Sequence, residues 1–364
     1  MHKFPDPALR ASCTRFLSGH GPMNAADWVE RLATSPSLVD GLDIYGDGPA
    51  VQRLETEVAA LLGKPAAMFF HKGVAAQQAA LMVHAANTGR RVVALHPRSH
   101  LALDEADTLD RLAGLISRRV GSHLAPFGVV ELDRIAEPLA AVTVELPLRQ
   151  AGFLGTGWDD LVAISAWARG QGTPFHLDAA RIWEVAPWLG RSLAEIAGLA
   201  DSVYVSFYKG LGGMGGCVLA GSEAFISAVR PWRTRFGGDM PTIFPYVLTA
   251  LDGLQQHLPR MGDYHRHACA IASAINLRPG LRATPDVPHG NSFRVLFQAP
   301  VAGLEAAASA LAREDGVWLA NRFAATEVPG WSFSEMMCGE ATLRWGAEEV
   351  ADALVGLERR VWAG

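Results

Sequence analysis

The chain is short of long apolar runs, paired cysteines and charge, and each shortage removes a class of protein. No run of about 18 apolar residues occurs, and the first residues lack the apolar core of a signal peptide. The four cysteines are far apart and match no zinc spacing, which is typical of free thiols in a reducing compartment. With 19% charged residues and a formal charge of −5, neither nucleic acid nor an anionic membrane is expected as a partner. We therefore expect a soluble cytoplasmic protein without a metal site.

Lysine is also scarce. Of the 32 basic residues only four are lysines: Lys3, Lys64, Lys72 and Lys209. A preference for arginine is compositional and proves no function by itself. Because arginine stays protonated, any chemistry that needs a free amine is restricted to these four positions.

The pattern of apolar segments predicts an α/β fold with a mostly parallel central sheet. Hydrophobic residues make up 49% of the 364 residues, and at roughly 100–200 residues per domain two domains are expected. Helices are predicted over 47–63, from 73 towards 86, and over 159–171. Between them lie unalternated apolar segments, typical of strands buried on both faces. The predicted strands are 67–70, 91–95, 114–120, 140–147, 174–178, 202–207 and 217–221.

The character of the sequence changes after Arg230. A long helical region over about 245–274 is followed by predicted strands at 291–298 and 341–346 and by a last helix from Glu348. We expect an N-terminal segment and large domain over residues 1–254, and a small α+β domain over residues 255–364.

Two reactive side chains follow predicted strands. Lys209 comes directly after strand 202–207 and precedes a glycine-rich stretch, while Asp178 ends strand 174–178. In parallel sheets ligands bind beyond the carboxyl ends of the strands, where desolvation makes a lysine nucleophilic towards an aldehyde. A carboxylate there keeps the ring nitrogen of pyridoxal phosphate protonated, and Arg181 offers a planar donor to a carboxylate or to the ring hydroxyl. The structural alternatives are a surface lysine and a helix-capping aspartate.

Gly73 opens a predicted helix after a strand, which favours a phosphate at the positive end of the helix. Lys72 beside it adds a charge. A glycine at such a turn is weak evidence when taken alone.

Four ordered segments carry a resemblance to the threonine aldolase/β-eliminating lyase family of pyridoxal-phosphate enzymes. They are DIYGDGPAVQRLE from Asp43, SHLALDE from Ser99, HLDAARIWE from His176 and SFYKGLG from Ser206. They occur in the order and at the spacing of the family, and the resemblance extends from about residue 10 to 350. It implies an aspartate-aminotransferase-like fold and a homodimer or homotetramer with shared active sites.

The resemblance also implies roles for individual residues. Lys209 would form the Schiff base with pyridoxal 5'-phosphate, Asp178 and Arg181 would hold the ring, and His100 would stack on it. Gly73 and Val74 would bind the phosphate. The substrate set implied is Arg181, Arg344 in a C-terminal strand, Tyr45 near a neighbouring active site, and Cys13.

The chain departs from the family pattern in three segments. Where the family carries hydroxyl-Gly-Thr, this chain has Lys72-Gly73-Val74, and we interpret Lys72 as a cation that replaces the hydroxyls. The GGGMR segment is here Gly237-Gly238-Asp239-Met240-Pro241, and the NTHN segment is Leu146-Pro147-Leu148-Arg149. These changes leave the cofactor residues in place and alter the substrate side.

Two other site types fit the sequence less well. Residues 210–215 (GLGGMG) match a dinucleotide-binding pattern, but a predicted strand follows instead of a helix, so a nicotinamide oxidoreductase is a remote alternative. His96 and His100 resemble metal ligands, but Pro97 separates them and no third ligand has suitable spacing.

We therefore predict a pyridoxal-phosphate-dependent aldehyde-lyase that cleaves or forms the Cα–Cβ bond of a β-hydroxy-α-amino acid, giving glycine and an aldehyde. His100 is the candidate base near the β-hydroxyl proton. The same cofactor also supports β-elimination, racemisation and aldol condensation with an unusual substrate, and these remain alternatives.

Overall fold

The computed structural model describes residues 6–362, which form two compact units. The larger unit comprises residues 25–259. The smaller unit combines the residues up to Asn24 with those from Arg260 onward. Within the described residues, no helix is both long and apolar enough to cross a membrane.

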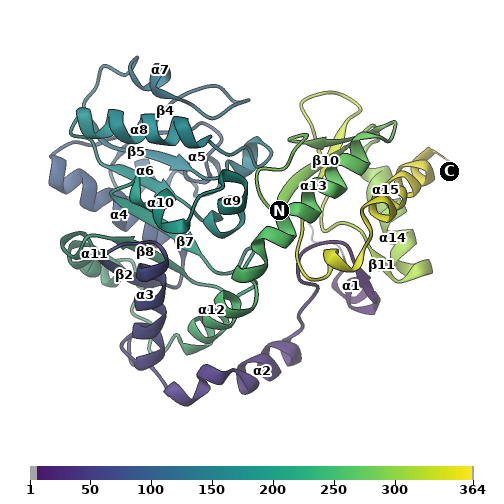
Figure 1. The fold of residues 1–364 in the computed structure, drawn as a ribbon, viewed down its shortest axis with the longest axis horizontal. Helices are drawn as coiled ribbons and strands as arrows, with labels where there is room; N and C mark the ends of the chain where they lie inside the picture. Colours follow the sequence, from purple (N-terminus) through teal and green to yellow (C-terminus); the bar gives the residue numbers. More distant parts are fainter. Residues whose placement is uncertain (1–5, 363–364) are drawn as a thin grey trace. The chain divides into compact units, whose positions relative to one another are not determined.

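The larger unit is built on a seven-stranded sheet with the order β2-β8-β7-β6-β5-β3-β4 (Figure 1). Strands β3 to β7 run parallel, while β8 runs antiparallel to both of its neighbours. Every residue of β5, β6, β7 and β8 is buried, as the unalternated apolar pattern predicts. The strands are β2 (Ala66–Phe70), β3 (Val92–Leu95), β4 (Ile116–Arg119), β5 (Leu139–Glu145), β6 (Phe175–Asp178), β7 (Ser202–Ser206) and β8 (Cys217–Gly221).

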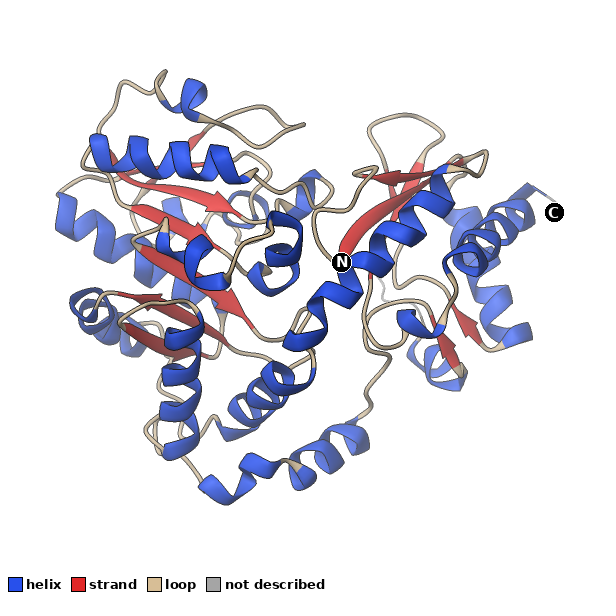
Figure 2. Cartoon of the chain, viewed as in Figure 1, coloured by secondary structure: helices blue, strands red, loops and turns tan. Residues whose placement is uncertain are grey.

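Helices lie on both faces of this sheet (Figure 2), which explains the absence of alternation in its strands. The predicted α/β class with a mostly parallel sheet is confirmed. The helices of the unit are α2 (Ala25–Thr34), α3 (Pro49–Leu61), α4 (Gly73–Thr88), α5 (His100–Leu103), α6 (Thr108–Arg111), α7 (Val129–Leu132), α8 (Trp158–Gly170), α9 (Ile182–Leu189), α10 (Leu193–Gly198), α11 (Glu223–Arg235) and α12 (Phe244–Gln256). Short 3₁₀ turns cover Pro36–Asp40, Arg149–Ala151 and Leu258–Arg260.

The smaller unit contains a four-stranded antiparallel sheet with the order β12-β13-β10-β9. Its strands are β9 (Leu281–Thr284), β10 (Ser292–Phe297), β12 (Ala324–Ala325) and β13 (Ser332–Met337). A separate parallel pair joins β1 (Arg15–Phe16) to β11 (Val317–Trp318). The helices are α1 (Pro7–Ser12), α13 (Met261–Asn276), α14 (Val301–Asp315) and α15 (Ala347–Trp362).

The division into units differs from the expected boundary. The chain enters the smaller unit at Arg260, and the residues before Ala25 belong to that unit as well. The cause is the pairing of β1 with β11, together with the packing of α1 on α14. A strand of two residues has too little pattern to be recognised in a sequence.

The predicted strand over 341–346 is wrong. Thr342–Arg344 form a 3₁₀ turn, in which the Trp345 N–H donates to the Thr342 carbonyl at 3.0 Å. The Thr342 hydroxyl also reaches the carbonyls of Leu17 and Met337, at 3.1 and 3.2 Å. Strand β10 pairs instead with β9 and β13, and the residues of β13 alternate between buried and half-buried.

Candidate active site

Asp178 and Lys209 lie at the carboxyl ends of the neighbouring strands β6 and β7, respectively. Asp178 is the last residue of β6 and is 3% exposed, and it lies opposite Tyr204 of β7. Lys209 follows β7 in a turn that two backbone hydrogen bonds close, from Gly212 to Lys209 at 3.0 Å and from Gly213 to Phe207 at 2.8 Å. The predicted placement of both residues at strand ends is therefore found.

The environment of Lys209 favours a neutral amine. Burial, and then the nearby charge of Arg181, lower the pKa of Lys209, whereas Asp178, Glu184 and Glu145 raise it; the resulting pKa is about 8. A lysine with such a pKa has a substantial neutral fraction near pH 8, and the neutral amine is the nucleophilic form.

Glu145 accompanies Asp178 at the sheet edge. It ends β5 directly opposite Asp178, and both carboxyl groups are buried. Burial raises the pKa of each group, and the negative charge of Asp178 raises the pKa of Glu145 further. Two backbone N–H groups donate to Glu145, from His100 at 2.5 Å and from Arg149 at 3.2 Å. Glu145 therefore anchors the first residue of α5.

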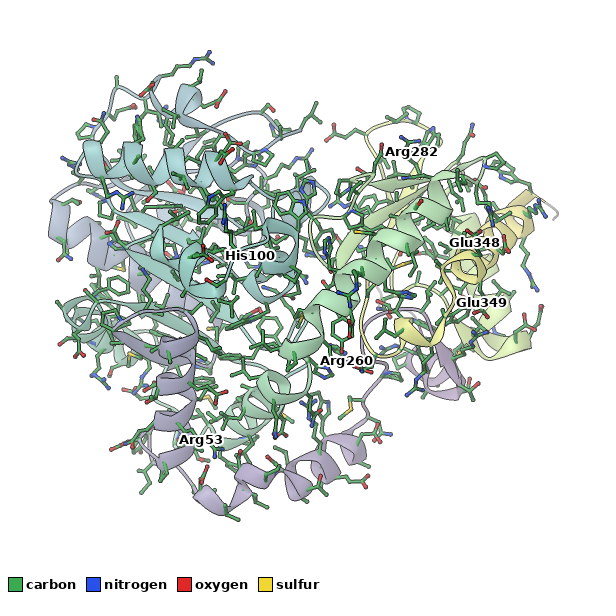
Figure 3. The ribbon with its side chains drawn as sticks, viewed as in Figure 1. Arg53, His100, Arg260, Arg282, Glu348 and Glu349 are labelled. Atoms are coloured by element: carbon green, nitrogen blue, oxygen red, sulfur yellow. The ribbon has the colours of Figure 1, made fainter. Side chains whose placement is uncertain are left out.

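His100, labelled in Figure 3, forms a histidine–carboxylate pair with Glu105. Its Nδ1 lies 2.9 Å from the Glu105 Oε1, and that carboxylate also accepts from Gln78 at 3.3 Å. The Glu105 bond raises the pKa of His100, with smaller contributions from Asp178 and Glu145 and against the effect of burial. Since a carboxylate accepts the Nδ1 proton, the Nε2 atom of the neutral ring carries the lone pair.

Arg181 and Glu184, at the start of α9, contact the turn that contains Lys209 (residues 207–213). The Glu184 Oε1 accepts from the Gly210 N–H at 2.8 Å and lies 3.8 Å from Nη1 of Arg181. The Arg181 guanidinium lies over the ring of Phe153, 5.3 Å from its centroid. Burial raises the pKa of Glu184, and the charge of Arg181 lowers it. This pair keeps the backbone beside Lys209 in place.

The turn before α4 brings backbone amides close to Tyr204. Gly73 is the first residue of α4, and a Cβ at this position would overlap the Tyr204 hydroxyl. Lys72 is the N-cap residue and is exposed, and Val74 is half-buried. Burial and the charge of Lys72 lower the pKa of His71. The start of α4 is therefore tightly packed, and only glycine fits at its first position.

Three predicted substrate residues lie on elements not described so far in this section. Tyr45 lies in a turn with a φ of 51°, where its N–H donates to Pro241 and its carbonyl accepts from Arg233. In the smaller unit, Arg344 is an exposed residue of the 3₁₀ turn, not of a strand.

Cys13 also belongs to the smaller unit. It is 7% exposed and packs with Ala312 and Trp318. Its thiol donates to the carbonyl of Leu9 at 3.3 Å, and burial raises its pKa. These contacts are typical of a core thiol.

Sequence reasoning missed the roles of three buried carboxylates at this site: Glu105, Glu145 and Glu184. Glu105 and Glu184 fall inside the segments SHLALDE and HLDAARIWE, so their position in these motifs was an available signal. Glu145 offered a weaker signal, as an acidic residue at the end of an otherwise apolar strand.

The glycine-rich stretch 210–215 leads into strand β8 and not into a helix. Its glycines permit close packing: a Cβ at Gly213 would lie 3.0 Å from the Phe207 carbonyl oxygen, and one at Gly215 would lie 2.8 Å from the Tyr246 ring. In the part of the chain that the structure describes, no group of three or more His, Cys, Asp or Glu residues is arranged to hold a metal ion.

The sheet order and the strand-end lysine define the fold of the pyridoxal-phosphate enzymes of the aspartate-aminotransferase type. Solved structures with this fold include Sphingomonas wittichii serine palmitoyltransferase (TM-score 0.70, 16% identity) and a Nostoc alanine–glyoxylate aminotransferase (TM-score 0.68, 16% identity). The first alignment covers 96% of this chain and 87% of the other, and the second covers 96% and 95%. At this identity the likeness concerns the fold alone.

The chain belongs to the beta-eliminating lyase family, whose model matches residues 36–297. It is 33% identical to an Exiguobacterium protein assigned as an aromatic amino acid beta-eliminating lyase/threonine aldolase (TM-score 0.89, 98% and 99% of the two chains covered). It is 32% identical to a Listeria monocytogenes protein assigned as an L-allo-threonine aldolase (TM-score 0.90, 97% and 98% covered). Arabidopsis thaliana low-specificity L-threonine aldolase 1 is 27% identical over 252 residues, 66% of this chain and 70% of the relative.

Proposed function

We propose that the protein is a pyridoxal-phosphate-dependent lyase that acts on the Cα–Cβ bond of a β-hydroxy-α-amino acid. Cleavage of this bond gives glycine and an aldehyde, and the reverse reaction joins them. The observation that carries the proposal is the cluster of Lys209, Asp178, Arg181 and His100 at the carboxyl edge of the sheet. Family membership and the similarity to proteins named as threonine aldolases support it.

The residues present fit this cofactor. Lys209 offers an amine with a lowered pKa for the aldehyde carbon, and Asp178 offers a buried carboxylate for the ring nitrogen. The tight start of α4, at Gly73 and Val74, offers backbone N–H groups to the phosphate, and Lys72 adds a cation. When bound, pyridoxal phosphate supplies an electron sink for the bond that breaks.

The other side chains of the site bind the substrate and transfer its proton. Arg181 binds a carboxylate of the substrate or the ring hydroxyl, and Glu184 limits its movement. His100 carries its lone pair on Nε2, because Glu105 holds Nδ1, and so accepts the proton of a β-hydroxyl group. Asp178 would keep the ring nitrogen of the bound cofactor protonated. Arg344 and Tyr45 remain proposed substrate contacts, Tyr45 through a second subunit; Cys13 has a core environment.

The proposal is tested by mixing purified protein and pyridoxal phosphate with threonine, allo-threonine and phenylserine and measuring aldehyde release. We expect aldehyde from at least one substrate, and none from Lys209→Ala. Borohydride reduction followed by peptide mapping should place the cofactor label on Lys209.

Two outcomes contradict the proposal at different levels. A label on Lys209 without any aldehyde would replace the aldolase reaction with β-elimination, racemisation or an aldol reaction on another substrate. The absence of a label would remove pyridoxal phosphate itself.

A further inference from the structure

A chain of four polar side chains runs between α4 and the central sheet, and the proposed reaction uses none of them. Gln77 and His84 project from α4, His176 from β6 and Ser202 from β7, and none is more than 4% exposed. The Gln77 Oε1 lies 2.6 Å from the His176 Nε2. Ser202 Oγ lies 2.7 Å from the His176 Nδ1 and 2.7 Å from the His84 Nε2.

The donors and acceptors of this chain have one consistent order. The amide oxygen of Gln77 only accepts, so the proton of the neutral His176 ring is on Nε2 and its Nδ1 accepts from the Ser202 hydroxyl. The Ser202 oxygen then accepts from the Nε2–H of His84. Burial lowers the pKa of His176 to about 3 and that of His84 to about 4, so both rings are neutral at neutral pH.

The ends of the chain adjoin two separate parts of the cofactor site. Gln77 lies one helical turn after Gly73, at the start of α4. His176 lies two residues before Asp178 on β6, and the two side chains therefore point to the same face of the strand. A shift of α4 along the sheet would change the separation of Gly73 and Asp178 and would break these short bonds.

We propose that the chain Gln77–His176–Ser202–His84 sets the position of the first turn of α4 relative to Asp178, so that the phosphate and the ring nitrogen of one pyridoxal phosphate are held together. This inference rests on the proposed function, because it assigns the two ends of the cofactor to these two places. The four residues are positioning residues that act through Gly73 and Asp178.

The alternative is a polar core that stabilises the fold without adjusting the site. The two roles differ in their effect on a ligand that lacks the phosphate. If α4 is mispositioned, pyridoxal phosphate should lose affinity, while pyridoxal, which lacks the phosphate proposed to bind at the start of α4, should keep its affinity. A general loss of stability affects both ligands alike.

The experiment measures the dissociation constants of pyridoxal phosphate and pyridoxal for the apoprotein, by absorbance titration, in wild type, Gln77→Leu and Ser202→Ala. Wild type should prefer the phosphorylated ligand. In Gln77→Leu we expect this preference to fall by about tenfold, the effect of one lost buried hydrogen bond. Ser202→Ala, a smaller change that removes the central link, should lower the preference in the same direction.

Ser165→Ala is the matched control, because it removes a buried hydroxyl that donates to the Leu199 carbonyl in the same unit and leaves α4 unchanged. It should keep the wild-type preference. An unchanged preference in folded Gln77→Leu and Ser202→Ala, or equal losses for both ligands, would overturn the inference alone. Failure of wild type to bind either ligand would overturn the proposed function and the inference together.

Discussion

Lys209 is the residue whose chemistry depends most on its surroundings. Burial and Arg181 lower its pKa, while the carboxylates of Asp178, Glu184 and Glu145 raise it, and the balance is a pKa of about 8. An exposed lysine has a pKa of about 10.4, so the site increases the neutral fraction of this amine at pH 8 by about two orders of magnitude.

The rate at which pyridoxal phosphate attaches to the apoprotein should therefore rise with pH through a midpoint near 8. Because the deprotonated amine is the reactive form, the rate is low below this midpoint and levels off above it. The measurement is the rate of appearance of the cofactor absorbance band between about pH 6 and about pH 11, a range that includes both a midpoint near 8 and the ordinary lysine pKa of about 10.4. A midpoint close to the ordinary lysine value would contradict the buried environment.

Asp178→Asn provides a check on the cause. The negative charge of Asp178 raises the pKa of Lys209, and its removal should move the midpoint to lower pH. A midpoint that moves upward would show that Asp178 acts on Lys209 by some means other than its charge.

Site residues could be predicted from the sequence where a reactive side chain lies at or just after the end of a strand. Lys209 and Asp178 were found from the sequence because each follows an apolar segment, and parallel strands bring such ends together. Glu145 could not be assigned a role in this way, because its partner is the backbone N–H of His100, 45 positions earlier in the chain. Arg344 lies in a 3₁₀ turn and not in the predicted strand. The Thr342 hydroxyl stabilises this turn by its hydrogen bonds to the carbonyls of Leu17 and Met337, and no local sequence pattern indicates these contacts.

At the scale of the element, the packing of α4 on the sheet depends on two neutral histidines: His84 on the helix and His176 on the underlying strand β6. His84 stacks on Phe225 and bonds to Ser202, and the nearby charge of Asp201 offsets only part of the effect of burial on its pKa. Both histidines have folded pKa values below the ordinary value of about 6.5. Between those values the unfolded chain binds more protons than the folded protein.

The free energy of unfolding should therefore fall as the pH drops below about 6.5. At pH 5 the two histidines should each lower it by about 2 kcal/mol relative to pH 7, from folded pKa values of about 4 and about 3. Urea unfolding of His84→Gln at both pH values should show a loss smaller than the wild-type loss by the share of one histidine. His123→Gln, at an exposed position, is the control and should keep the full loss. An equal loss in His84→Gln and wild type would mean that His84 has the same pKa in the folded protein as in the unfolded chain, which would contradict its neutral state in the core.

Most elements could be predicted because their patterns are local. Helix α3 matches its apolar stripe, and β5 and β6 match their unalternated segments. The polar residues Gln77 and His176 within such segments could not be interpreted, because nothing in the sequence indicates that they face each other across 99 positions.

At the scale of the whole molecule, the smaller unit is assembled from both ends of the chain. The Trp345 indole N–H donates to the Phe16 carbonyl at 2.9 Å, and the Arg15 guanidinium lies over the same indole, 3.6 Å from the ring centroid. Arg15 also pairs with Glu349 at 2.6 Å. These contacts add to the short β1–β11 pair, which contributes few hydrogen bonds by itself.

Trp345→Phe should therefore lower the free energy of unfolding of the smaller unit by about 1–3 kcal/mol, because the Phe16 carbonyl loses its buried donor. Urea unfolding followed by circular dichroism measures the change. Trp362→Phe is the matched control, since this tryptophan is 67% exposed, and it should leave the midpoint unchanged. An equally stable Trp345→Phe protein would show that this hydrogen bond does not stabilise the smaller unit.

The same connectivity has a consequence for synthesis on the ribosome. Strand β1 ends at Phe16 and its partner β11 begins at Val317, so about 300 residues are translated between them. At about 5–20 residues per second, the first strand waits roughly 15–60 s for its partner, long enough for residues 25–259 to emerge complete. The larger unit can therefore fold first. Strand β1 can pair with β11 only after the residues around Val317 have left the exit tunnel.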